Sequence, residues 1–118
     1  MKISSYKDLM VWQRGMDLVE TVYTISKKLP SNEQFGLTSQ LRRAAVSIPS
    51  NIAEGYGRQS TGNYKQFLSI SRGSLLELET QLLLCIRLKY FDNDEVEIIL
   101  KDTETLGKMI SSLISKIK

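Results

Sequence analysis

The chain is organised around the stretch Gln40-Leu-Arg-Arg-Ala-Ala-Val-Ser-Ile-Pro-Ser-Asn-Ile-Ala-Glu-Gly-Tyr-Gly-Arg58. Its apolar residues recur at intervals of three and four, which is the spacing of an amphipathic helix. Pro49 falls inside this pattern, where it removes one backbone donor and crowds the carbonyl of Ala45. The stretch therefore predicts a helix that is kinked at Pro49 and ends near Gly55 and Gly57.

Helical spacing recurs in three further segments, and no segment shows the period-two alternation of a strand. The first helix is expected between Ser5 and Pro30, and the helix containing Pro49 is expected to open at the capping pattern 31–34. The third should run from about Thr61 to Tyr90, and the fourth should start at 92–95. Short connections between such helices predict an all-α, antiparallel up-down-up-down four-helix bundle in a single domain of residues 1–118.

The first helix carries two neighbouring rows of apolar residues, called seams below, and together they present more apolar surface than one bundle interior needs. Trp12 and Tyr23 lie on one seam, which we expect to face the core, and Val11 lies on the other. The surplus is explained either by a wide core face or by an interface between subunits. The residues expected at such an interface are Val11, Leu18, Val22, Leu76, Leu83 and Tyr90.

Composition excludes several classes of active site. The chain has no histidine and a single cysteine, Cys85, so it cannot hold a histidine-based catalytic triad or a thiolate zinc site within one chain. We expect no cofactor, no metal and no enzymatic activity. The N-terminus lacks the apolar stretch of a signal peptide, and no apolar run is long enough to span a membrane. These features favour a cytoplasmic protein with a buried free thiol.

Positive charge is concentrated in the middle third of the chain. Residues 36–73 contain five basic residues and one acidic residue, whereas residues 74–118 contain six basic and eight acidic residues. Such a cluster is compatible with phosphate contacts to a nucleic acid, and also with a solvated helix face that forms ion pairs. Arg43 should face solvent and Arg42 should flank the core. The candidate nucleic-acid-binding residues are Arg42, Arg43, Arg58, Lys65 and Arg72.

A compact group of polar residues surrounds the proline. It is interpreted as a structural network that fixes the kink and the packing of the third helix, with a binding notch as the alternative. The glycine-rich segment 55–62 could form an anion nest, but ordinary helix-end chemistry explains it as well. The residues of the polar group are Ser47, Pro49, Ser50, Asn51, Glu54 and Gly55.

Four segments carry a resemblance to a known family: 9–13, 35–45, 47–55 and 73–79, of which Ser47-Ile-Pro-Ser-Asn-Ile-Ala-Glu-Gly55 is the most specific. The chain resembles the bacterial four-helix bundle proteins encoded in intervening sequences of 23S ribosomal RNA genes, also labelled S23 ribosomal proteins. The resemblance covers essentially the whole chain and implies a homopentamer. The accessory variability determinants of diversity-generating retroelements look like relatives, which implies nucleic acid and a reverse transcriptase as possible partners.

Two functions follow as expectations. The first is a homo-oligomeric, non-enzymatic scaffold that binds RNA or DNA through the basic middle third, as an accessory to an rRNA intervening sequence or a mobile element. In a ring, repeated weak cationic patches would add up to useful avidity. The second is a protein-interaction scaffold without affinity for nucleic acid.

Overall fold

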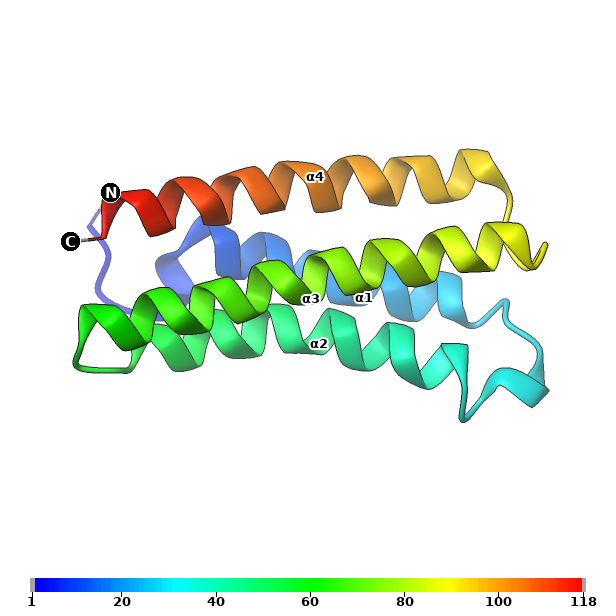
Figure 1. Cartoon of the computed structure of the whole chain (residues 1–118), viewed down its shortest axis with the longest axis horizontal. Coiled ribbons are helices and arrows are strands. Elements are labelled where there is room, and N and C mark those ends of the chain that lie inside the picture. The colour runs from blue at the N-terminus through cyan, green and yellow to red at the C-terminus, as the bar shows by residue number, and fades with distance from the viewer. Residues whose placement is uncertain (1, 118) are drawn as a thin grey trace.

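The computed structural model describes residues 2–117, and within them the chain forms four α-helices and no strand. Two short 3-10 helices, η1 (Tyr6–Asp8) and η2 (Ser31–Glu33), precede the first two of these helices. Figure 1 shows the α-helices lying side by side along the long axis of the molecule, with consecutive helices running in opposite directions. The prediction of an all-α four-helix bundle is confirmed. The helices are α1 (Met10–Ser26), α2 (Leu37–Tyr56), α3 (Thr61–Arg87) and α4 (Asn93–Lys116).

Local capping explains where α3 and α4 begin. The Ser60 hydroxyl accepts a hydrogen bond from the amide of Asn63, which places the start of α3 as predicted. Asp92 and Glu95 form a reciprocal capping box at the start of α4. Both ends are set by residues within four positions of one another, so the sequence pattern was sufficient to find them.

The start of α2 differs from the prediction. Residues 31–33 form η2, and the α-helix begins only at Leu37, after Gly36 adopts a non-helical conformation with φ −107° and ψ −114°. Glu33, a member of the predicted capping pattern, nevertheless caps α2: its Oε1 accepts a hydrogen bond from the amide of Leu37 at 3.1 Å. Similarly, Ser5 and Asp8 form a capping box for η1, while α1 starts at Met10.

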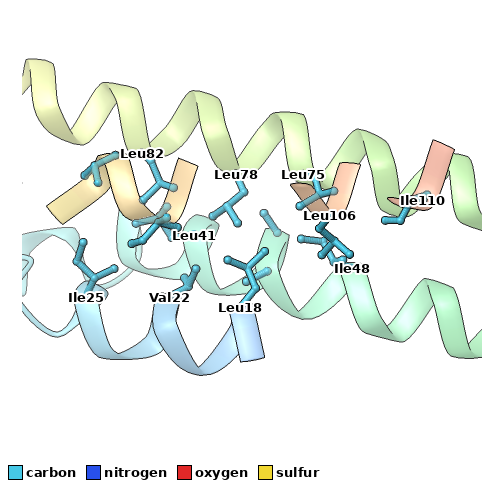
Figure 2. Close-up of a cluster of buried hydrophobic side chains, with 14 of the residues drawn as sticks. Leu18, Val22, Ile25, Leu41, Ile48, Leu75, Leu78, Leu82, Leu106 and Ile110 are labelled. Atoms are coloured by element: carbon cyan, nitrogen blue, oxygen red, sulfur yellow. The ribbon is translucent and has the colours of Figure 1, made fainter. Parts of the chain in front are cut away.

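The core receives side chains from all four α-helices. In Figure 2 these side chains converge in the space between the helices. Because the core runs the full length of the bundle, no helix can be removed without exposing apolar surface to water. Its fully buried members include Val22, Leu41, Ile48, Ile52, Leu68, Leu75, Leu78, Leu82, Val96, Leu106 and Ile110.

The seam of α1 that faces the core is the one containing Gly15. A Cβ atom built on Gly15 would lie 3.3 Å from Cβ of Pro49, so the absence of a side chain lets α2 approach closely. Trp12 is half-buried and packs against the core, whereas Tyr23 is exposed, so the prediction that they face the core is confirmed for Trp12 and wrong for Tyr23. The helix α2 continues through Pro49 without a break from Leu37 to Tyr56; the kink itself stays a prediction.

Candidate nucleic-acid interface

Three of the five predicted phosphate-binding cations have partners within the chain. Arg42 flanks the core, as expected, and turns toward α1. Its Nε donates a hydrogen bond to Oγ of Ser26 at 2.9 Å, and its guanidinium lies 4.6 Å from the centroid of the Tyr23 ring. A guanidinium stacked on an aromatic ring and bonded to a buried hydroxyl loses freedom to follow a phosphate. Arg42 is therefore mainly a link between α1 and α2.

Arg58 and Arg72 also have partners within the chain. Arg58 donates to Oε2 of Glu54 at 2.8 Å and lies 4.9 Å from the centroid of the Phe67 ring. Arg72 donates from Nη1 to Oγ of Ser111 at 3.0 Å and so links α3 to α4. Within residues 2–117, Glu54 forms an ion pair with Arg58 and none with Arg42 or Arg72. Phosphate contacts by Arg58 and Arg72 stay a prediction.

Arg43 and Lys65 form no ion pair within residues 2–117. Arg43 is exposed on α2, as expected, whereas Lys65 is half-buried near the start of α3. Lys65 stands seven residues before Arg72, hence on the same side of α3, about 10 Å away along the axis. These two cations thus stand on different helices, α2 and α3.

Arg43 stands on a ridge between two grooves. The ridge consists of Phe35, Ser39, Arg43 and Ser47, which are spaced four residues apart and line both grooves. The groove between α1 and α2 has a volume of about 620 Å³ and no acidic lining residue. The groove between α2 and α3 has a volume of about 470 Å³. Both exceed the lower size of pockets that hold small ligands.

Sequence reasoning missed two residues of this region. Phe35 precedes α2 and its side chain is 91% exposed, more than any other large apolar residue among those described. Gln81 is only 6% exposed and lines the α2–α3 groove. The signals were present: a lone aromatic residue among polar neighbours at 31–36, and a glutamine three residues after Leu78 on the core stripe of α3.

The polar residues around Pro49 form a hydrogen-bonded network between α2 and α3. Oγ of Ser47 lies 2.9 Å from Oγ of Ser74, and Asn51 donates to both the carbonyl and the hydroxyl of Ser47. Oγ of Ser71 donates to the carbonyl of Ile48 at 2.9 Å. Small hydroxyl residues on α3 thus satisfy backbone and side-chain groups beside the proline. This geometry favours the structural interpretation.

The remaining members of that polar group have separate roles. Ser50 is exposed, and Glu54 pairs with Arg58. Gly55 is buried where α3 crosses α2, since a Cβ atom there would lie 2.7 Å from Cβ of Phe67. Gly57 ends the helix with φ −77°, and no glycine within residues 2–117 has a positive φ. The αR–αL form of an anion nest is therefore absent from 55–62, and helix-end geometry accounts for this segment.

The predicted interface residues divide into two groups. Val11, Leu18 and Val22 are buried in the core of the single chain, so placing them at a subunit surface was wrong. Leu76 and Leu83 on α3 are 61% and 50% exposed. The last predicted member, Tyr90, is half-buried and donates to Oε2 of Glu33 at 2.9 Å, a bond that raises the pKa of the phenol.

Groups suited to acid–base or metal chemistry do not converge in the part of the chain that the structure describes. No set of three or more His, Cys, Asp or Glu residues there is placed to hold a metal ion. Cys85 is buried and free, and burial raises the pKa of its thiol to about 11, with the charge of Glu33 acting in the same direction. A thiol with such a pKa stays protonated and inert at neutral pH. None of the helices in residues 2–117 is long and apolar enough to cross a membrane.

Comparisons with known proteins point to one family. The family described as 23S rRNA-intervening sequence protein matches residues 7–112. Among solved structures, the chain is similar to a protein of unknown function from the S23 ribosomal protein family of Bacteroides thetaiotaomicron, with 29% sequence identity and a TM-score of 0.82. That similarity covers 89% of this chain and 98% of the other. No curated protein matches the chain at a significant level.

Proposed function

The chain belongs to the family of 23S rRNA-intervening sequence proteins, and from this premise we propose that it is a non-enzymatic helical scaffold that forms a homo-oligomer and binds RNA or DNA. The observation that carries the proposal is the position of Arg43. This cation is exposed, forms no ion pair within residues 2–117, and lies on a ridge beside the exposed ring of Phe35. Cations bind nucleic-acid phosphates and exposed rings stack on bases. A protein encoded by an intervening sequence of a 23S rRNA gene would be produced close to that RNA.

A charge-reversal experiment tests nucleic-acid binding. The variant Arg43→Glu/Lys65→Glu changes two cations that form no ion pair, whereas Lys101→Glu/Lys108→Glu makes the same change of net charge on α4. Binding to a structured RNA and to duplex DNA is measured by fluorescence anisotropy over a salt series. We expect the first variant to lose binding and the second to keep it. Equal affinities of the two variants would refute the assignment of Arg43 and Lys65.

Self-association is supported by an exposed apolar row on α3. Leu76 and Leu83 stand seven residues apart, with Thr80 between them and Gly73 three residues before Leu76, at the alternating steps of three and four that bring one helix face against another. Exposed apolar surface of this kind marks sites of protein association. The family resemblance implies five subunits. A pentamer would repeat each weak cationic site around a ring and increase avidity.

The state of association is tested by sedimentation velocity. We expect the unmodified protein to sediment as a pentamer, and Leu76→Ser/Leu83→Ser to sediment as smaller species. The matched control is Ile98→Ser, which removes an exposed apolar side chain from α4. A monomer before any substitution would remove this part of the proposal.

A second candidate function is the binding of a protein partner without affinity for nucleic acid. It is favoured by the groove between α1 and α4, which has a volume of about 430 Å³ and contains the exposed Ile98 beside Ile25 and Ile99. The genomic neighbourhood distinguishes the two functions, because a gene inside a 23S rRNA insertion or beside a reverse transcriptase favours nucleic-acid binding. A partner that binds through this groove should be lost with Ile98→Asp and retained with Leu76→Asp, measured by co-purification of the co-expressed pair.

A further inference from the structure

Gln81 is an unusual residue for the interior of this bundle. Its side chain is 6% exposed, its Oε1 is sealed from solvent, and that oxygen has no hydrogen-bond partner. Buried amides in folded proteins are nearly always paired, because an unpaired group has lost its water without replacement. The same residue lines the groove between α2 and α3. Because this oxygen is sealed as the side chain stands, a ligand in the groove would contact it only after the amide rotates about its terminal torsion.

The groups around Gln81 define the chemistry of that ligand. The carboxylate of Glu77 lines the same groove and accepts hydrogen bonds, and the amide of Gln81 can present either its oxygen or its nitrogen by rotation about its terminal torsion. Phe35, at 91% exposure, offers a flat apolar face that also lines the groove. The ligand should therefore be flat, apolar on its faces and rich in hydrogen-bond donors along one edge. A nucleobase with an exocyclic amino group has these properties.

The charged residues that line the two grooves favour a position for the ligand's phosphate in the α1–α2 groove, across the ridge from its base. Glu77 would repel a phosphate within the α2–α3 groove. The neighbouring α1–α2 groove has no acidic lining residue and holds both Arg42 and Arg43. Because Arg43 lines both grooves, its guanidinium can contact a phosphate while the attached base reaches Glu77 and Gln81.

We propose that the groove between α2 and α3 binds one unpaired base that carries an exocyclic amino group, stacked on Phe35, with its edge on Glu77 and Gln81 and its phosphate on Arg43. The inference rests on the proposed nucleic-acid-binding function and deepens it. A duplex cannot offer a base in this way, since its bases are stacked and paired. The protein should therefore prefer single strands and should distinguish bases.

The test is binding of labelled single-stranded heptamers of C, A and U, each as RNA and as DNA, and of a duplex, by fluorescence anisotropy. Uracil lacks the exocyclic amino group, so we expect the C and A heptamers to bind about tenfold tighter than U. The RNA and DNA versions of each heptamer identify which nucleic acid the groove takes.

Three variants separate the contacts. Phe35→Ala should weaken single-strand binding about tenfold and leave duplex binding unchanged, while Ile98→Ala, another exposed apolar residue, should change neither. Gln81→Met keeps the volume and should reduce the preference for C and A over U. Urea unfolding checks that each variant is folded. Binding without base preference and insensitive to Phe35→Ala would overturn this inference and leave the proposed function standing; absence of binding to every nucleic acid would overturn both.

Discussion

Gly55 gives the sharpest test of how α2 and α3 pack. A Cβ atom at this position would lie 2.7 Å from Cβ of Phe67 and 3.3 Å from the backbone carbonyl oxygen of Tyr64. Neither atom is the free end of a flexible side chain, so Gly55→Ala must push α3 away from α2. The contact closes the helical hairpin on which the polar network beside Pro49 depends.

Two opposing effects set the magnitude. Alanine favours the helix over glycine by about 1 kcal/mol, while forcing one methyl group into a well-packed site costs about 1–3 kcal/mol. Because the closest atom is at 2.7 Å, the steric cost should lie in the upper part of this range, about 2–3 kcal/mol, and Gly55→Ala should destabilise the fold by roughly 1–2 kcal/mol. The matched control is Gly107→Ala in α4, where the nearest atom, Cδ1 of Leu75, is at an ordinary 3.9 Å. That substitution should stabilise by about 0.5–1 kcal/mol.

Urea unfolding followed by circular dichroism measures both variants, at one fixed protein concentration because association shifts apparent stability. The expected result is a lower midpoint for Gly55→Ala and a higher midpoint for Gly107→Ala, with unchanged denaturant slopes. If Gly55→Ala were as stable as the unmodified protein, the close approach of α3 at this glycine would be refuted.

Three further predictions concern single sites. Burial raises the pKa of the Cys85 thiol from 9.0 to about 11, so between these values the folded state keeps a proton that the unfolded state loses. This contribution to stability should be complete below pH 9 and should fall by about 2 kcal/mol as pH rises toward 11. Cys85→Ala should flatten this part of the pH profile of urea midpoints. Lys89 follows the end of α3 with φ 65°, the left-handed conformation that favours glycine, and its amide donates to the carbonyl of Ile86. Lys89→Gly should therefore raise thermal stability by about 1 kcal/mol, while Lys89→Ala should not. Ser71→Ala removes the buried hydrogen bond to the carbonyl of Ile48 and should cost about 1 kcal/mol in urea unfolding, against less than about 0.5 kcal/mol for the exposed Ser69→Ala.

Short sequence patterns correctly predicted those helix starts that depend on hydrogen bonds between neighbouring residues. The capping residues Ser60 and Asp92 lie within four positions of the amides they serve, so their patterns located the starts of α3 and α4. The opening of α2 was predicted too early because Gly36 adopts a non-helical conformation. A capping pattern cannot reveal this backbone choice, and Glu33 fulfils its capping role from outside the α-helix.

Interactions between distant segments were beyond reach of the pattern. The composition of residues 36–73 showed a surplus of cations, but the hydroxyls that engage Arg42 and Arg72 come from Ser26 and Ser111, outside that segment. The groove beside Gln81 has the same origin, because Phe35 and Gln81 are far apart in sequence and line one groove only after α3 folds against α2.

The sequence by itself determined that this chain forms four helices, where α3 and α4 begin, and to which family it belongs, because periodicity, capping and motif spacing are properties of neighbouring residues. Only the tertiary structure decided which of the two apolar seams of α1 is buried. Both seams are apolar enough to be core. The buried seam is the one in which Gly15, having no side chain, lets Pro49 of α2 approach closely. The tertiary structure likewise leaves Arg43 without an ion pair among the described residues while engaging Arg58 with Glu54, because ion pairs and grooves are made by side chains that meet only in the folded bundle.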